Sequence, residues 1–210
     1  MKTKIIVASA LLGVAAGCAH MAHMSSYVQE PTNEQVKAVL KGSFREMGQA
    51  KLDRLDQDEV QRLCSAAGAG KALAKEEAER IEKSQLANIK YPADGYMGDW
   101  KAGEKIAQQG TGKQYSDDPA QPAGGNCYAC HELTQEEIAF GTIGPSLRNF
   151  GKTRGFTPEM QKYAYGKIYN SEAYAACSNM PRFGHMGILT EKQIKDVVAL
   201  LMDPQSPVNK

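Results

Sequence analysis

The stretch NCYACH, residues 126–131, decides the fold of this 210-residue chain because it is a Cys-x-x-Cys-His motif. Two thiols at this spacing can each add to one vinyl group of the same haem. The histidine that follows then lies under the iron as its proximal ligand. The motif predicts a covalently attached haem c, held by Cys127 and Cys130, with His131 as an axial iron ligand. The chain has no second such motif, so the sequence predicts one haem.

Two other chemistries use a Cys-x-x-Cys pair. A thioredoxin-like redox pair is typical of a βαβ context, and no strand-like alternation surrounds residues 126–131. Half of a zinc site would need a second Cys-x-x-Cys or His-x-His cluster, which the chain does not contain. Haem attachment is therefore the interpretation that the residues favour.

The sixth position of the iron needs a second ligand, and the chain offers several. Met180 stands in SNMPRFG, residues 178–184, where Pro181 biases it toward an extended backbone and away from a helix. A methionine in such a loop has less reason than a helical one to be part of the core, so Met180 is the predicted ligand. His185 and Met186 are the alternatives, and an open position is the third. A thioether ligand favours ferrous iron and suits electron transfer.

The N-terminus has the three-part pattern of a secretory signal peptide. Two lysines precede an apolar run at residues 5–16, and small residues follow. The pattern predicts a signal peptide over residues 1–22. A lipoprotein-type site would instead end it at residue 17 and make Cys18 the lipidated N-terminus. Either form of export predicts the periplasm, where disulfides persist.

Two cysteines remain once the motif and the leader are set aside. In an exported protein such a pair suggests a disulfide, here between Cys64 and Cys177, and two free thiols are the alternative. The bridge would close a loop of more than 100 residues. A loop of that length predicts a stabilisation of about 4–5 kcal/mol.

Composition excludes several classes of protein. The chain is 42% hydrophobic and 23% charged, and 25 Lys+Arg nearly balance 24 Asp+Glu. These values are typical of a globular protein. The near balance of charge gives no basis for non-specific electrostatic binding to nucleic acid. We expect no nucleic-acid partner, and membrane contact only through a lipid on Cys18.

The hydrophobic pattern is helical throughout and predicts an all-α chain. Helices are expected at residues 31–47, 52–67, 71–89, 99–109, 158–169 and 190–202, and residues 52–67 form either one helix or a pair of short ones. A helical turn is expected at 134–137 and loops at 141–155 and 178–187. The first three lie in a predicted N-terminal helical extension, residues 24–92. Residues 93–210 would form the haem domain.

Close packing is expected at two glycines, and propionate contacts at a few larger residues. Gly144-Pro145 can pack on the proximal imidazole, with a nearby carbonyl accepting its Nδ1–H; a simple turn is the alternative. Gly103 would allow a close crossing with the C-terminal helix. Arg182 is a candidate donor to a haem propionate. Trp100 and tyrosines among Tyr163, Tyr165, Tyr169 and Tyr174 are others, with ordinary packing as the alternative.

The chain resembles SoxX, the monohaem cytochrome c subunit of the SoxAX complex of bacterial sulfur oxidation. The resemblance lies in NCYACHEL, GTIGPSLRNFGKTRG, the long block YAYGKIYNSEAYAACSNMPRFGHMGILTEKQIKDVVALLMDP and the ending SPVNK. It is strong over residues 126–210. Upstream, REMGQAKLDRLDQDEVQRLCS, residues 45–65, resembles the extension of the longer members.

The resemblance implies a class I cytochrome c fold with His131 and Met180 as axial ligands. The implied partner is SoxA, which carries its own haem or haems. The pair would act as a heteromeric L-cysteine S-thiosulfotransferase that couples thiosulfate oxidatively to a cysteine of the carrier protein SoxYZ. The catalytic haem is expected on the partner, so no catalytic residue is expected on this chain. It would accept the electrons and pass them to a downstream soluble cytochrome c.

Two other functions follow from the motif alone. One is a stand-alone periplasmic or lipid-anchored cytochrome c that shuttles electrons. The other is a haem enzyme or gas sensor with a vacant iron position, which requires that Met180 does not bind the iron.

Overall fold

The computed structural model describes residues 31–70 and 72–210, so the predicted signal peptide and Cys18 lie outside the described residues. The chain divides into two compact units, Met1–Arg45 and Glu46–Lys210. The second unit contains the haem motif together with much of the predicted extension. The predicted division between an extension and a haem domain at residues 92 and 93 stays a prediction.

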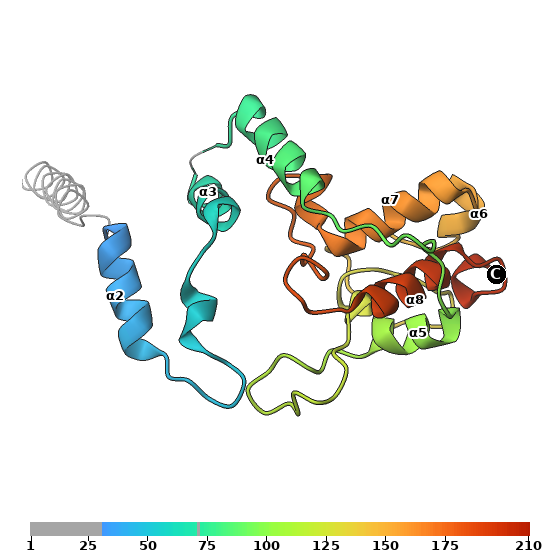
Figure 1. Cartoon of the computed structure of the whole chain (residues 1–210), viewed down its shortest axis with the longest axis horizontal. Helices are drawn as coiled ribbons and strands as arrows, with labels where there is room; N and C mark the ends of the chain where they lie inside the picture. Colours follow the sequence, from blue (N-terminus) through green and yellow to red (C-terminus); the bar gives the residue numbers. More distant parts are fainter. Residues whose placement is uncertain (1–30, 71) are drawn as a thin grey trace, which may run out of the picture. The chain divides into compact units, whose positions relative to one another are not determined.

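Helix α2, Asn33–Ser43, belongs to the first unit (Figure 1). Thr32 begins the helix with a capping box, because its side chain accepts from the Gln35 amide and the Gln35 side chain accepts in return. Phe44 is extended and ends it, so the helix is shorter than the predicted 31–47. No residue of α2 is buried, and Val39 is 66% exposed.

The second unit begins with three short helical elements. These are the 3₁₀ turn η1, Leu52–Leu55, and the helices α3, Glu59–Gly68, and α4, Lys75–Ala87. Asp58 begins α3 with a capping box to Gln61. The stretch 52–67 therefore forms a pair of short helical elements, η1 and α3, which is the second of the two expected forms. Ile81 of α4 is buried, and α4 packs against the 3₁₀ turn η3, Ser171–Ala173.

The remaining helices surround α8, Glu191–Met202, which is the most buried helix of the unit. Figure 1 shows α5 (green) and α7 (orange) on either side of α8 (red), and both helices contact it. The other elements are α5, Trp100–Gln108; η2, Cys127–Ala129; α6, Phe150–Arg154; α7, Pro158–Tyr169; and η4, Pro207–Asn209. Over residues 31–70 and 72–210 the fold is all-α, with one isolated bridge, between Met47 and Ala50. No helix in this described part is long and apolar enough to cross a membrane.

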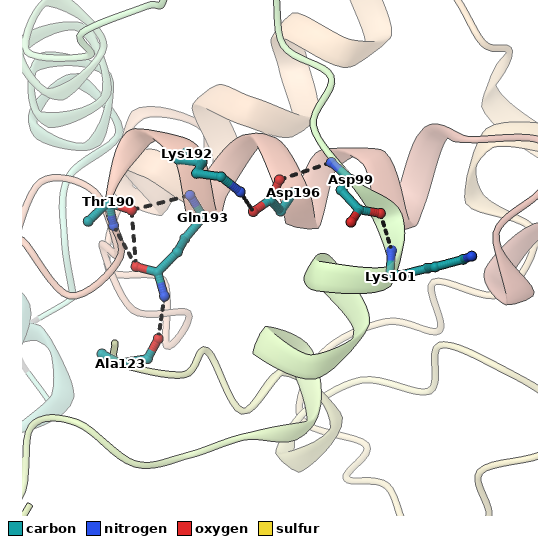
Figure 2. Close-up of polar contacts among 7 residues, drawn as sticks. All are labelled: Asp99, Lys101, Ala123, Thr190, Lys192, Gln193 and Asp196. Atoms are coloured by element: carbon teal, nitrogen blue, oxygen red, sulfur yellow. Dashed lines mark hydrogen bonds and ion pairs between the residues drawn. The ribbon is translucent and has the colours of Figure 1, made fainter. Parts of the chain in front are cut away.

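The crossing of α5 and α8 depends on Gly103. A Cβ at this position would lie 2.0 Å from the Asp196 carbonyl oxygen, so only glycine allows the approach. The side chain of Asp196 joins the same helices, because it accepts from the Asp99 amide at 2.9 Å and from Lys192 Nζ at 2.7 Å (Figure 2). The close crossing expected from the sequence is confirmed.

Two local predictions are wrong. Residues 134–137 are not helical, although Thr134 Oγ1 accepts from the Glu137 amide at 3.4 Å as a helix cap would. The predicted loop 141–155 contains helix α6. Its first turn is held by Asn209, whose Oδ1 accepts from the amides of Gly151 at 2.9 Å and Lys152 at 3.2 Å. A partner 58 positions away leaves no local pattern in the sequence.

Candidate haem site

The segment that leads into the Cys-x-x-Cys-His motif is fixed by α5 and α8. Gln193, near the start of α8, donates from Nε2 to the Ala123 carbonyl at 2.6 Å (Figure 2). The amide of Asn126 donates to the carbonyl of Gln109, which ends α5, at 2.9 Å. Asn126 then turns the chain in the left-handed region, at φ 46°. The crossed helices therefore set the place and direction in which the motif begins.

The motif folds as a tight turn. The amides of Cys130 and His131 both donate to the Cys127 carbonyl, at 3.1 and 2.9 Å. The thiols of Cys127 and Cys130 are not bonded to each other. Burial raises the pKa of the Cys127 thiol to about 12. A thiol that is protonated at neutral pH is unlike the reactive thiolate of a thioredoxin-like pair.

The proximal imidazole is oriented by a backbone carbonyl. His131 Nδ1 lies 2.7 Å from the Pro145 oxygen. Because a carbonyl can only accept, Nδ1 carries the proton and Nε2 keeps its lone pair for a metal. Gly144 packs directly against the imidazole ring, since a Cβ at this position would be 2.1 Å from His131 Cε1. Both features expected of Gly144-Pro145 are confirmed.

Replacing Gly144 with alanine should displace the proximal histidine or the loop that covers it. Forcing a methyl group into this contact should lower the free energy of unfolding of the haem-loaded protein by about 1–3 kcal/mol. Denaturant unfolding of the oxidised protein measures the change. Gly68→Ala is the matched control, because nothing lies within 4 Å of a Cβ at Gly68. Equal unfolding of both variants and the wild type would contradict the packing described.

The three sequence candidates for the sixth ligand differ in their surroundings. Met180 is partly buried and packs on the hydrophobic core. Its backbone is held on both sides, because Ser171 Oγ donates to the Met180 carbonyl and the Met180 amide donates to Ser178 Oγ at 3.2 Å. Met186 is 51% exposed, and His185 lines a cleft formed with residues of α3 and α4. Among these three side chains, only Met180 combines core packing with a fixed backbone; its role as ligand stays a prediction.

The loop that carries Met180 is attached to α3 and α4 at three points. Cys64 of α3 is joined to Cys177 by a disulfide, as the two leftover cysteines suggested. Glu82 of α4 accepts from the Ala176 amide at 3.1 Å. Asp58, the cap of α3, pairs with Arg182 at 2.6 Å. Of these three contacts, the sequence indicated only the cysteine pair, because nothing near Asp58 or Glu82 points to a partner so far along the chain.

The residues present fit a haem c. The site offers two unbonded thiols, an imidazole with Nε2 available and a loop methionine on the core. Arg182 adds a cation whose side chain is only 8% exposed. Its Nη1 is buried and has no hydrogen-bond partner among the described residues. A haem brings two propionate carboxylates, and a guanidinium is well suited to bind a carboxylate.

Comparison with known families agrees with this geometry. Residues 120–203 match the family described as Cytochrome c, and the match includes the motif, Gly144 and Met180. This segment is a cytochrome c domain. The domain carries covalent haem c, and its helical architecture is that of a class I cytochrome c. The haem motif is typical of electron-transfer proteins.

One relative extends beyond this domain. A protein of Aquifex aeolicus (strain VF5), described as an uncharacterized lipoprotein, is 46% identical over 132 residues. The aligned part makes up 61% of this chain and 61% of that protein. The similarity therefore covers more residues than the cytochrome c match of residues 120–203.

Proposed function

We propose that this chain is the electron-transfer subunit of a SoxAX-type complex, with His131 and Met180 as the axial ligands of its haem. The observation that carries the proposal is the SNMPRFG loop, residues 178–184, which is the most specific part of the resemblance to SoxX. Its first residue holds the Met180 amide, and Arg182 is buried. Its last glycine lies against the Tyr169 ring, where a Cβ would be 2.3 Å from the nearest ring atom. These contacts hold the loop in place on either side of Met180.

The bound haem supplies one-electron chemistry by cycling between ferric and ferrous iron. Cys127 and Cys130 keep it on the chain in an exported protein. The Pro145 carbonyl holds His131 in one tautomer and one orientation, with Nε2 as the ligating nitrogen. Met180 packs on the core and offers a thioether as iron ligand. A thioether favours ferrous iron, which suits a protein that accepts electrons.

The proposed reaction takes place on the partner. A thiosulfate ion and a thiol of the SoxYZ carrier join through a new sulfur–sulfur bond, the thiol proton goes to solvent, and two electrons are released. The partner SoxA would carry the catalytic haem of this L-cysteine S-thiosulfotransferase. This chain would accept the electrons one at a time and pass each to a soluble cytochrome c.

We infer that the chain works in the periplasm, from the signal-peptide pattern at residues 1–22. The description of the Aquifex relative as a lipoprotein supports a lipid on Cys18, which would tether the haem domain to a membrane surface. The same description favours a second function, a lipid-anchored cytochrome c that shuttles electrons without a SoxA partner.

Purification of the tagged protein from its native periplasmic and membrane fractions tests the proposal. Haem staining and mass spectrometry would identify what accompanies it. We expect a second cytochrome in stoichiometric amount, and reduction of the haem by thiosulfate only when the carrier protein is added. A lone monohaem protein that stays oxidised with thiosulfate and carrier would contradict the SoxAX role and leave the electron shuttle.

A further inference from the structure

Arg182 is a buried cation that is paired on one side only. Its Nη2 donates to Asp58 Oδ2 at 2.6 Å, whereas its Nη1 is buried without a partner among the described residues. The side chain stands two positions after Met180, in the loop that carries the predicted sixth ligand. Burying a guanidinium nitrogen without a hydrogen-bond acceptor costs free energy. An acceptor on the haem would supply the missing hydrogen bond of Nη1.

Asp58 reaches Arg182 from a different part of the chain, 124 positions away. Its side chain is 41% exposed, so the pair has a buried end at the arginine and a solvated end at the carboxylate. Burial acts to raise the pKa of Asp58, but the Gln61 amide and the hydrogen bond and charge of Arg182 outweigh it and lower the pKa. Asp58 is therefore ionised at neutral pH.

We propose that Asp58 is a positioning residue that sets the reduction potential of the haem through Arg182, by aiming the free Nη1 at a haem propionate and offsetting the arginine's charge. The segment before the haem domain thereby becomes part of the redox centre. The proposal rests on the bound haem and not on the electron donor. A failed thiosulfate assay would leave it standing.

The sign of the effect follows from charge. Ferric haem carries one more positive charge than ferrous haem, so a nearby cation disfavours the ferric state and raises the potential. Asp58 offsets that cation, and its own negative charge favours the ferric state. Glu172 and His185 are the other titratable groups near this pair, and each interacts electrostatically with both Arg182 and Asp58. Removing the charge of Asp58 should therefore raise the potential.

Asp58→Asn separates this role from the role of Asp58 as a helix cap. Asparagine caps a helix about as well as aspartate, so α3 should keep its first turn while the pair loses its negative charge. We expect a potentiometric titration of the Asn variant to show a three- to tenfold shift of the oxidised-to-reduced ratio toward the reduced form. A tenfold shift corresponds to 59 mV for one electron.

Glu59→Gln is the matched control. Glu59 is the next carboxylate along the chain, is solvent-exposed and pairs with Arg80 at 3.0 Å instead of Arg182. We expect the haem of the Glu59→Gln variant to have the same reduction potential as the wild type. An Asp58→Asn variant whose potential is unchanged or lowered would overturn the proposal. So would a shift of equal size in Glu59→Gln, because it would reflect surface charge alone.

A double-mutant cycle tests whether Asp58 acts through Arg182. In an Arg182→Gln background, Asp58→Asn should shift the potential less than in the wild type, because only its direct charge effect remains. If Arg182→Gln fails to retain haem, Arg182→Lys replaces it, since lysine keeps the charge but loses the planar fork. An equal shift in both backgrounds would show that Asp58 acts independently of Arg182 and would overturn the proposed route.

Discussion

Replacing Met180 with alanine should lower the reduction potential of the haem by a few hundred millivolts and change its ferric absorption spectrum. Axial ligands set haem potentials over a range of about 0.8 V, and a thioether raises the potential by favouring ferrous iron. Loss of the thioether leaves water or an open position opposite His131. The variant should therefore be harder to reduce and should bind small exogenous ligands, which the wild type should not.

Met186→Ala is the control for this substitution. It removes a methionine from the same loop, but from a side chain that is 51% exposed. The absorption spectrum and the redox titration of this control should match those of the wild type. An unchanged Met180→Ala spectrum would show that the assigned ligand is wrong. A changed Met186→Ala spectrum would point to Met186 instead.

Removal of the Cys64–Cys177 disulfide should lower the free energy of unfolding by about 4–5 kcal/mol. The bonded residues are 113 positions apart, and a long closed loop restricts the unfolded chain strongly. The bond also ends three residues before Met180. Its loss should increase the rate at which an added ligand displaces the methionine. Denaturant unfolding of Cys64→Ala/Cys177→Ala in the oxidised, haem-loaded state measures the first effect.

Two comparisons keep this result specific. Cys177 has a positive φ of 61°, and alanine at the same φ keeps whatever strain exists there. The single variant Cys64→Ala should therefore unfold like the double variant. The wild type treated with a thiol reductant should also resemble it. A double variant as stable as the oxidised wild type would contradict a stabilising role for the bond.

The features that sequence analysis predicted are local or follow from known chemistry. The haem motif is a run of adjacent residues. The packing of Gly144-Pro145 on His131 follows from what a proximal imidazole requires. Gly103 was recognisable because an all-helical core needs one small residue at its closest crossing. In each case a short sequence pattern, together with a physical requirement, is enough to predict the feature.

The features that sequence analysis missed depend on distant partners. Asp58 and Gln61 form a visible capping box, but nothing local shows that Asp58 also binds Arg182. Helix α6 lies in a stretch of glycine and proline that is typical of loops, and it is stabilised by Asn209 near the C-terminus. At residues 134–137 the cap residue is present, yet no helix follows. At α6 a tertiary contact therefore overrides the local preference for a loop.

The central claim is that Cys127 and Cys130 hold one haem c next to His131. Mass spectrometry of the denatured protein, purified from a host that can mature c-type cytochromes, tests it most directly. We expect the mass of the chain plus one haem, with the haem retained after denaturation and lost in Cys127→Ala/Cys130→Ala. A wild-type chain that releases its haem on denaturation, or that carries a Cys127–Cys130 disulfide and no haem, would contradict the account.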